Sequence, residues 1–90
     1  MLVTFGRPNM RQLITTPGQV GEILRGRRKS RRLPQKALAA KLGISQERLS
    51  RLETDATGIR LDRLIAVANL LGLELVLEDK ADAPAPESEW

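Results

Sequence analysis

A short polar segment after Gly43 holds the side chains that are best suited to hydrogen-bonding chemistry. Ser45 is a good N-cap, so a helix is expected to begin there. The polar face of that helix consists of four residues: Gln46, Glu47, Ser50 and Arg51. Amide, carboxylate, hydroxyl and guanidinium groups form the hydrogen bonds by which proteins distinguish base edges in the major groove of DNA. We therefore predict that these four residues read DNA bases, although Glu47 is equally suited to stabilising the start of the helix.

Six further residues are expected to contact the phosphate backbone of DNA. Gln35 stands at the start of the preceding helix, where free N–H groups attract phosphate oxygens. The six residues are Gln35, Lys36, Ser45, Arg48, Thr54 and Arg28. Arg48 lies off the base-reading face and is also placed to contact a second subunit. In residues 25–32, six of the eight residues are cationic, and some of them are expected to touch phosphate. Glu53 is expected to pair with a nearby arginine instead.

Residues 33–53 form the unit that must position these side chains, because they have the pattern of two short helices joined by a glycine turn. Pro34 is favourable at the first position of the first helix. Gly43 falls where the chain must turn sharply with a positive φ. Leu49 and Leu52 attach the second helix to the apolar core. This layout is that of a DNA-binding helix-turn-helix, whose second helix enters the major groove.

Two amphipathic helices are expected to flank this unit. One begins after Thr16, whose spacing to Gln19 is that of a capping box, and it fades near Lys29. The apolar face of the other is formed by Leu61, Leu64, Ile65, Ala68 and Leu71. Gly72 is expected to end this helix, whereas the turn before it offers no strong N-cap.

Residues 73–78 alternate between two faces and predict a β-strand. A strand must pair its exposed N–H and C=O groups, and within this chain only residues 2–5 offer a partner. The simpler solution is pairing with the same strand of a second copy about a two-fold axis. We therefore predict a dimer whose interface includes Leu73, Leu75, Val76 and Leu77.

The two ends of the chain differ in composition from its centre. The segments are an N-terminal arm (1–15), a helix-turn-helix domain (16–72), a dimerisation strand (73–79) and an acidic tail (80–90). The arm is expected to be flexible, and Met10 is a second possible start of translation. The tail has nothing to bury and is expected to be disordered, yet it ends in Trp90, a residue type that often anchors binding motifs.

Composition narrows the function further. Residues 1–77 carry a net charge of +8 and residues 78–90 a net charge of −4, which suggests two partners, the first a nucleic acid. The chain has no Cys and no His, which disfavours disulfides, the usual zinc sites and Cys or His catalysis. No cofactor, metal or enzymatic activity is expected. No apolar run is long enough to span a membrane and no signal peptide is evident, so we expect a cytoplasmic protein associated with the nucleoid.

The segment from Leu33-Pro34-Gln35 to Glu53, with the helix that follows, resembles the Cro/C1-type helix-turn-helix of phage repressors, also called the xenobiotic-response-element family. This resemblance implies an all-α, lambda-repressor-like domain of four to five helices, here with one C-terminal β-strand pairing across a dimer and a disordered tail.

A narrower resemblance, carried by the strand, the acidic tail and the closing Glu89-Trp90, is to HipB-type antitoxins, which pair with HipA-type serine/threonine kinase toxins. It implies a homodimer that binds double-stranded operator DNA, represses its own transcription and neutralises the kinase through Trp90 and Glu89. One alternative is a stand-alone phage-type repressor without a toxin, and another is a protein-interaction adaptor that has lost DNA binding.

Overall fold

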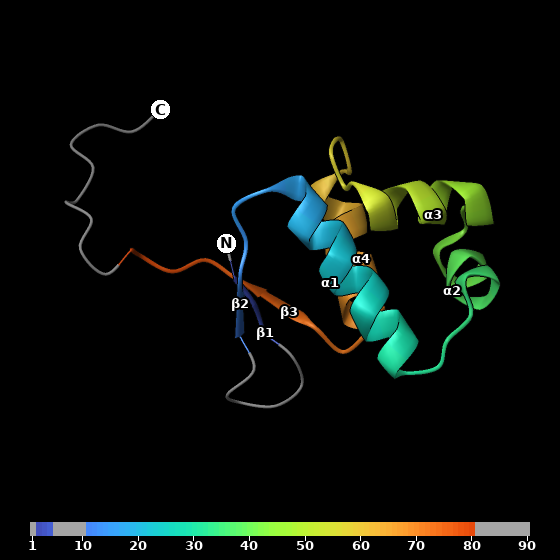
Figure 1. The fold of residues 1–90 in the computed structure, drawn as a ribbon, viewed down its shortest axis with the longest axis horizontal. Helices are drawn as coiled ribbons and strands as arrows, with labels where there is room; N and C mark the ends of the chain where they lie inside the picture. The colour runs from blue at the N-terminus through green and yellow to red at the C-terminus, as the bar shows by residue number, and fades with distance from the viewer. Residues whose placement is uncertain (1, 5–10, 81–90) are drawn as a thin grey trace.

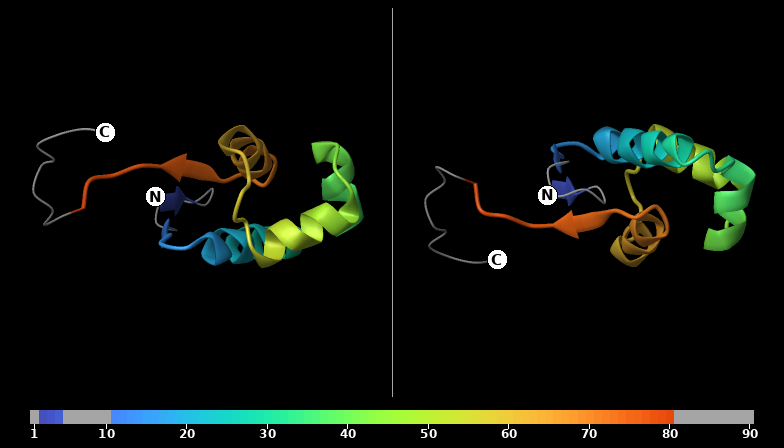
Figure 2. Two further views of the ribbon diagram at one scale, coloured as in Figure 1. Left: turned by 90° about the horizontal axis from the view of Figure 1, so that it is seen from above. Right: turned by 90° about the horizontal axis from the view of Figure 1, so that it is seen from below.

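The structure, a computed structural model, describes residues 2–4 and 11–80. In chain order its elements are β1 (Leu2–Thr4), β2 (Arg11–Leu13), α1 (Pro17–Ser30), α2 (Gln35–Leu42), α3 (Gln46–Thr54), α4 (Leu61–Leu70) and β3 (Glu74–Val76). The strands lie at one end of the molecule and the α2–α3 pair at the other, with α1 and α4 between them (Figures 1 and 2). The described residues therefore form a domain of four helices, within the predicted four to five, with a small sheet added.

The start of α1 is the predicted capping box. The Thr16 hydroxyl accepts a hydrogen bond from the Gln19 N–H at 3.4 Å, and the Gln19 side-chain oxygen accepts one from the Thr16 N–H at 2.9 Å. These bonds satisfy two N–H groups that a helix start leaves free. The helix ends at Ser30, one residue beyond Lys29, where the sequence indicated that it fades.

The turn between α2 and α3 is also as predicted. Gly43 has a φ of 71°, and the N–H of Ile44 donates to the Ala39 carbonyl at 3.1 Å, which closes the end of α2. The Ser45 hydroxyl then caps α3 by accepting a hydrogen bond from the Arg48 N–H at 3.0 Å. Pro34 is the N-cap of α2 instead of its first residue, a shift of one position.

The end of α4 is closed by its own glycine and by α1. Gly72 has a φ of 73°, and the N–H of Leu73 donates to the Ala68 carbonyl at 2.8 Å. The last turn of α4 contains no basic residue, but Arg27 of α1 donates from Nε to the Leu71 carbonyl at 2.9 Å. A cation from another helix thus stabilises the negative end of α4. At its start, Arg60 makes no capping bond through its side chain, in line with the weak N-cap read from the sequence.

The core is aliphatic, as a chain with so few aromatic residues requires. Its largest fully buried side chains come from α2, α3, α4 and the segment after α4: Leu38, Leu49, Val67, Leu71 and Leu73. Ile14 and α1 complete the cluster on the other side. Burying each such side chain contributes about 1.5–3 kcal/mol. Within the described residues, no helix is long and apolar enough to cross a membrane.

The sheet corrects the expectation that the C-terminal strand lacks a partner in the chain. β1 lies in the centre and pairs antiparallel with both neighbours, so that Leu2 lies opposite Leu13 of β2 and Val76 of β3. The described part of the N-terminal arm therefore includes two strands. Leu2–Thr4, within the alternative partner that the sequence offered, pairs with β3. The prediction of a single strand paired only across a dimer is wrong, because one edge of β3 is already occupied. The tail beyond Lys80 lies outside the described residues.

Candidate nucleic-acid interface

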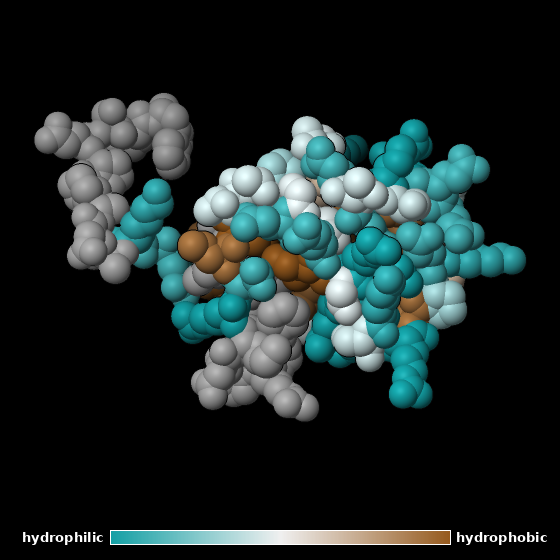
Figure 3. Space-filling model, viewed as in Figure 1, coloured by the Kyte–Doolittle hydropathy of each residue, from teal (hydrophilic) through white to brown (hydrophobic). Residues whose placement is uncertain are grey.

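The polar face of α3 is open to solvent at the end of the molecule away from the sheet. The four candidate base-reading residues, Gln46, Glu47, Ser50 and Arg51, are all exposed. Figure 3 shows hydrophilic side chains over the α2–α3 end and apolar surface on the side of the sheet. The arrangement leaves the amino end of α3 free to enter a groove of DNA.

A chain of side-chain hydrogen bonds connects this face to the interior. Arg28 of α1 donates to both carboxylate oxygens of Glu53, from Nε at 2.6 Å and from Nη2 at 3.0 Å. Gln35 donates from Nε2 to Glu53 Oε1 at 3.0 Å, and Gln46 donates from Nε2 to Gln35 Oε1 at 3.4 Å. The ion pair is buried, with side-chain exposures of 9% and 2%. The Gln46 amide is therefore held by Gln35, which is itself held by the buried carboxylate of Glu53.

Arg28 is a correction to the predicted phosphate contacts. Its guanidinium is buried, and besides the two bonds to Glu53 it donates from Nη1 to the Leu33 carbonyl at 2.9 Å. A side chain engaged in this way cannot reach DNA without breaking a buried pair. The expectation that Glu53 pairs with an arginine is confirmed, and Arg28 is that arginine.

The other cations of the basic run 25–32 include residues bound within the fold and residues exposed to solvent. Arg27 holds the end of α4, and the guanidinium of Arg31 lies against Gly72, where a Cβ atom would come within 2.5 Å of it. Arg25, Lys29, Arg31 and Arg32 are exposed. Arg32 has a φ of 53°, in the left-handed region that favours glycine. Four of the six cations thus stay exposed, whereas Arg28 is buried and Arg27 is bound to the end of α4.

The other candidate phosphate contacts lie on α2, on α3 and in the turn between them, and four of these five residues are exposed. Lys36, Ser45 and Arg48 are exposed, whereas Gln35 is half-buried by its bonds to Glu53 and Gln46. Thr54 is exposed, but its hydroxyl donates to the Ser50 carbonyl at 3.1 Å. Gln35 thus acts first as a positioning residue for Gln46, a role that its place in the sequence did not reveal.

Gly21 sets the distance between α1 and α3. A Cβ atom at this position would lie 2.7 Å from the carbonyl oxygens of both Leu52 and Glu53. The two helices can therefore approach this closely only because residue 21 has no side chain. The sequence pattern alone does not distinguish Gly21 from Gly18 and Gly26 on the same helix.

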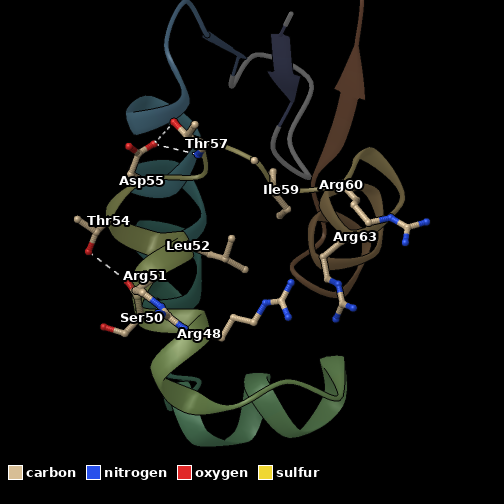
Figure 4. A pocket seen from close by; sticks show the side chains of 11 residues that line it. Arg48, Ser50, Arg51, Leu52, Thr54, Asp55, Thr57, Ile59, Arg60 and Arg63 are labelled. Carbon is tan, nitrogen blue, oxygen red and sulfur yellow. Dashed lines mark hydrogen bonds between the residues drawn. The ribbon is translucent and has the colours of Figure 1, made fainter.

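The loop between α3 and α4 forms a cationic groove beside the polar face of α3. The groove encloses about 590 Å³ and includes Arg48 and Arg51 of α3 together with Arg60 and Arg63 around the start of α4 (Figure 4). On the rim, Asp55 Oδ1 accepts hydrogen bonds from the Thr57 hydroxyl at 2.7 Å and from the Thr57 N–H at 2.9 Å. These bonds favour the charged carboxylate and lower the pKa of Asp55 below its ordinary value of 3.8.

The residues predicted for dimerisation do not share one environment. Leu73 is 2% exposed and belongs to the core, so it cannot contribute to an interface. Leu75 and Val76 are half-buried, and Leu77 is 82% exposed. The predicted toxin contacts, Glu89 and Trp90, lie outside the described residues.

A comparison with protein families agrees with the helix-turn-helix arrangement of α2 and α3. The HTH_3 family of helix-turn-helix domains matches residues 16–77, from the capping box of α1 to the end of the sheet. No curated protein matches the chain.

Among solved structures, a crystal structure of Fe(II)-HppE with the alternative substrate (S)-1-HPP is 28% identical, with a TM-score of 0.60. The match covers 67% of this chain and 31% of that one, so this chain spans about a third of the length of that protein. Within the described residues, no group of three or more His, Cys, Asp or Glu side chains is placed to hold a metal ion.

Proposed function

Because the chain belongs to the Cro/C1-type helix-turn-helix family HTH_3 and is thus a DNA-binding transcription regulator, we propose that it is an autorepressor that also serves as an antitoxin. It binds operator DNA as a homodimer and neutralises a HipA-type serine/threonine kinase. The proposed role is carried out in the cytoplasm, at the nucleoid.

The observation that carries the DNA-binding part is the hydrogen-bonded path from Arg28 through Glu53 and Gln35 to Gln46. An exposed glutamine has many rotamers, and fixing one of them costs conformational entropy on binding. Here the fold holds the Gln46 amide beside the start of α3, where it can form a bidentate pair with adenine. Glu47, Ser50 and Arg51 extend the same face, and Lys36, Ser45, Arg48 and Thr54 supply backbone contacts.

The homodimer is supported by the position of β3 at the edge of the sheet. In the strand order β2-β1-β3, β3 is an outer strand of the described sheet. Apolar side chains lie exposed on α4 and beyond β3, namely Leu61, Ile65, Leu70 and Leu77. An edge strand flanked by exposed apolar surface is a favourable site for pairing with a second copy. We expect Leu77→Lys to shift sedimentation from dimer towards monomer, whereas an unchanged dimer would refute this interface.

The antitoxin role is supported by the charge division of the chain, in which an acidic segment with Glu89 and Trp90 follows the basic DNA-binding body. A pull-down from the native host compares the full chain with a chain that ends at Glu78. Recovery of a kinase by the full chain, weakened without the tail, is the expected result.

A second candidate is a stand-alone repressor, which the family match and the fold support equally. This candidate predicts that the full chain and the chain ending at Glu78 recover the same DNA and that neither recovers a kinase. That result would overturn the antitoxin role. A protein that recovers no DNA at all would be an adaptor instead.

A further inference from the structure

The cationic groove between α3 and α4 has the composition of a binding site for an acidic peptide. Four guanidinium groups, those of Arg48, Arg51, Arg60 and Arg63, line the groove together with the apolar side chains of Leu52 and Ile59. Figure 4 shows Arg48 and Arg63 reaching from opposite helices into the space between them, while Leu52 and Ile59 lie above. The groove therefore combines positive charge with apolar surface.

These guanidinium groups keep much of their hydrogen-bonding capacity. Arg48 makes no side-chain hydrogen bond or ion pair within the described part of the chain and is exposed. Arg63 donates from Nη1 to the Leu42 carbonyl at 3.0 Å, which anchors it and leaves its other donors available. Arg60 pairs with Asp62 at 3.3 Å, but both side chains are well exposed, so this pair is weak and exchangeable. Asp55, the carboxylate on the rim, is engaged by Thr57.

We propose that the groove binds the acidic C-terminal segment of this same chain, residues 82–90. That segment carries Asp82, Glu87 and Glu89, which complement the guanidinium groups, and Trp90, whose ring suits the apolar lining beside the arginines. Ten residues separate Lys80 from the end of the sequence, and an extended chain of ten residues spans roughly 33 Å. The longest dimension of the molecule is 45 Å, so this reach covers most of it.

On the basis of the proposed function, occupation of the groove has a consequence for DNA binding. Ser50, Arg51 and Thr54 line the groove and also belong to the face that is proposed to contact DNA. The docked tail and DNA therefore compete for the same flank of α3. A partner that captures Trp90 removes the tail and makes the flank available, so capture of the tail and DNA binding favour each other.

The fluorescence of Trp90 tests the docking without DNA or any partner. The chain has one Trp and no Tyr, so the emission of the full chain reports on Trp90 alone. We expect blue-shifted emission and quenching by acrylamide that is about two- to fivefold weaker than in a free peptide of residues 81–90. The double variant Arg48→Gln/Arg60→Gln should restore peptide-like emission, whereas Arg25→Gln, which removes an exposed cation from α1, should not. Peptide-like emission in the full chain would overturn the proposal.

DNA affinity provides a second readout. The double variant Glu87→Gln/Glu89→Gln is expected to bind duplex DNA roughly three- to tenfold more tightly than the wild type, because its tail competes less well with DNA for the groove. If the groove holds a DNA phosphate instead of the tail, Arg60→Gln will weaken DNA binding while the Trp90 emission of every variant equals that of the peptide. That result would contradict tail docking and leave the DNA-binding function intact.

Discussion

Replacing Gly21 with alanine is expected to destabilise the domain, although alanine is a better helix former than glycine. The new Cβ atom would lie 2.7 Å from the carbonyl oxygens of Leu52 and Glu53 and 2.9 Å from the Glu53 carbonyl carbon. All three are backbone atoms, so the clash is relieved only if α1 or α3 shifts. Overpacking of this kind costs about 1–3 kcal/mol, and alanine regains only about 0.5–1 kcal/mol of helix stability. We therefore expect a net loss of about 1–2 kcal/mol.

Gly26 provides the matched control on the same helix, because a Cβ atom there would meet nothing within 4 Å. Gly26→Ala should raise the free energy of unfolding by about 0.5–1 kcal/mol through helix propensity alone. Urea denaturation of the two variants measures the contrast directly, and thermal unfolding should show melting temperatures that move in opposite directions. Equal stabilisation by the two alanines would refute the close approach of α1 and α3.

Three further changes test particular contacts. Arg28→Met should cost about 3–5 kcal/mol in urea unfolding, because it leaves the Glu53 carboxylate buried without its cation; a loss below about 1 kcal/mol would show that the pair is not buried. Arg32→Gly should raise stability by about 0.5–1 kcal/mol, since the φ of 53° suits glycine, and a decrease would contradict that backbone geometry. An NMR titration should give Asp55 a pKa below its ordinary value, so that its stabilising contribution is present above pH 3.8 and is lost as the pH falls through the lowered pKa; Thr57→Val should raise that pKa, and no change would rule out the Thr57 hydroxyl as the cause.

Local signals in the sequence were sufficient for the helices and their ends. The capping box at Thr16, the cap at Ser45 and the left-handed glycine at position 43 each act within four residues, so the sequence specifies them directly. The amphipathic pattern of α4 is similarly local. The polar face of α3 follows from the start of that helix, which is why its exposure could be predicted.

Features that depend on contacts between distant segments could not be predicted in this way. β1 and β2 have three residues each, too few to show a period, and β1 pairs with a strand about seventy residues away. Arg28 stands in a run of cations, and only the fold shows that it alone faces Glu53, 25 residues further along. The close approach at Gly21 and the positioning role of Gln35 likewise require the packing of α1 against α3.

The central claim is that the amino end of α3 reads DNA bases, and a competition assay with two variants tests it most directly. Duplexes enriched from random sequence by the full chain are compared with the unselected pool for the wild type, Gln46→Ala and Lys36→Ala. Gln46→Ala should lose about 1–3 kcal/mol of discrimination between the two pools, whereas Lys36→Ala should weaken binding to both pools equally. Equal losses on both pools for Gln46→Ala, or no enrichment by the wild type, would contradict base reading by α3.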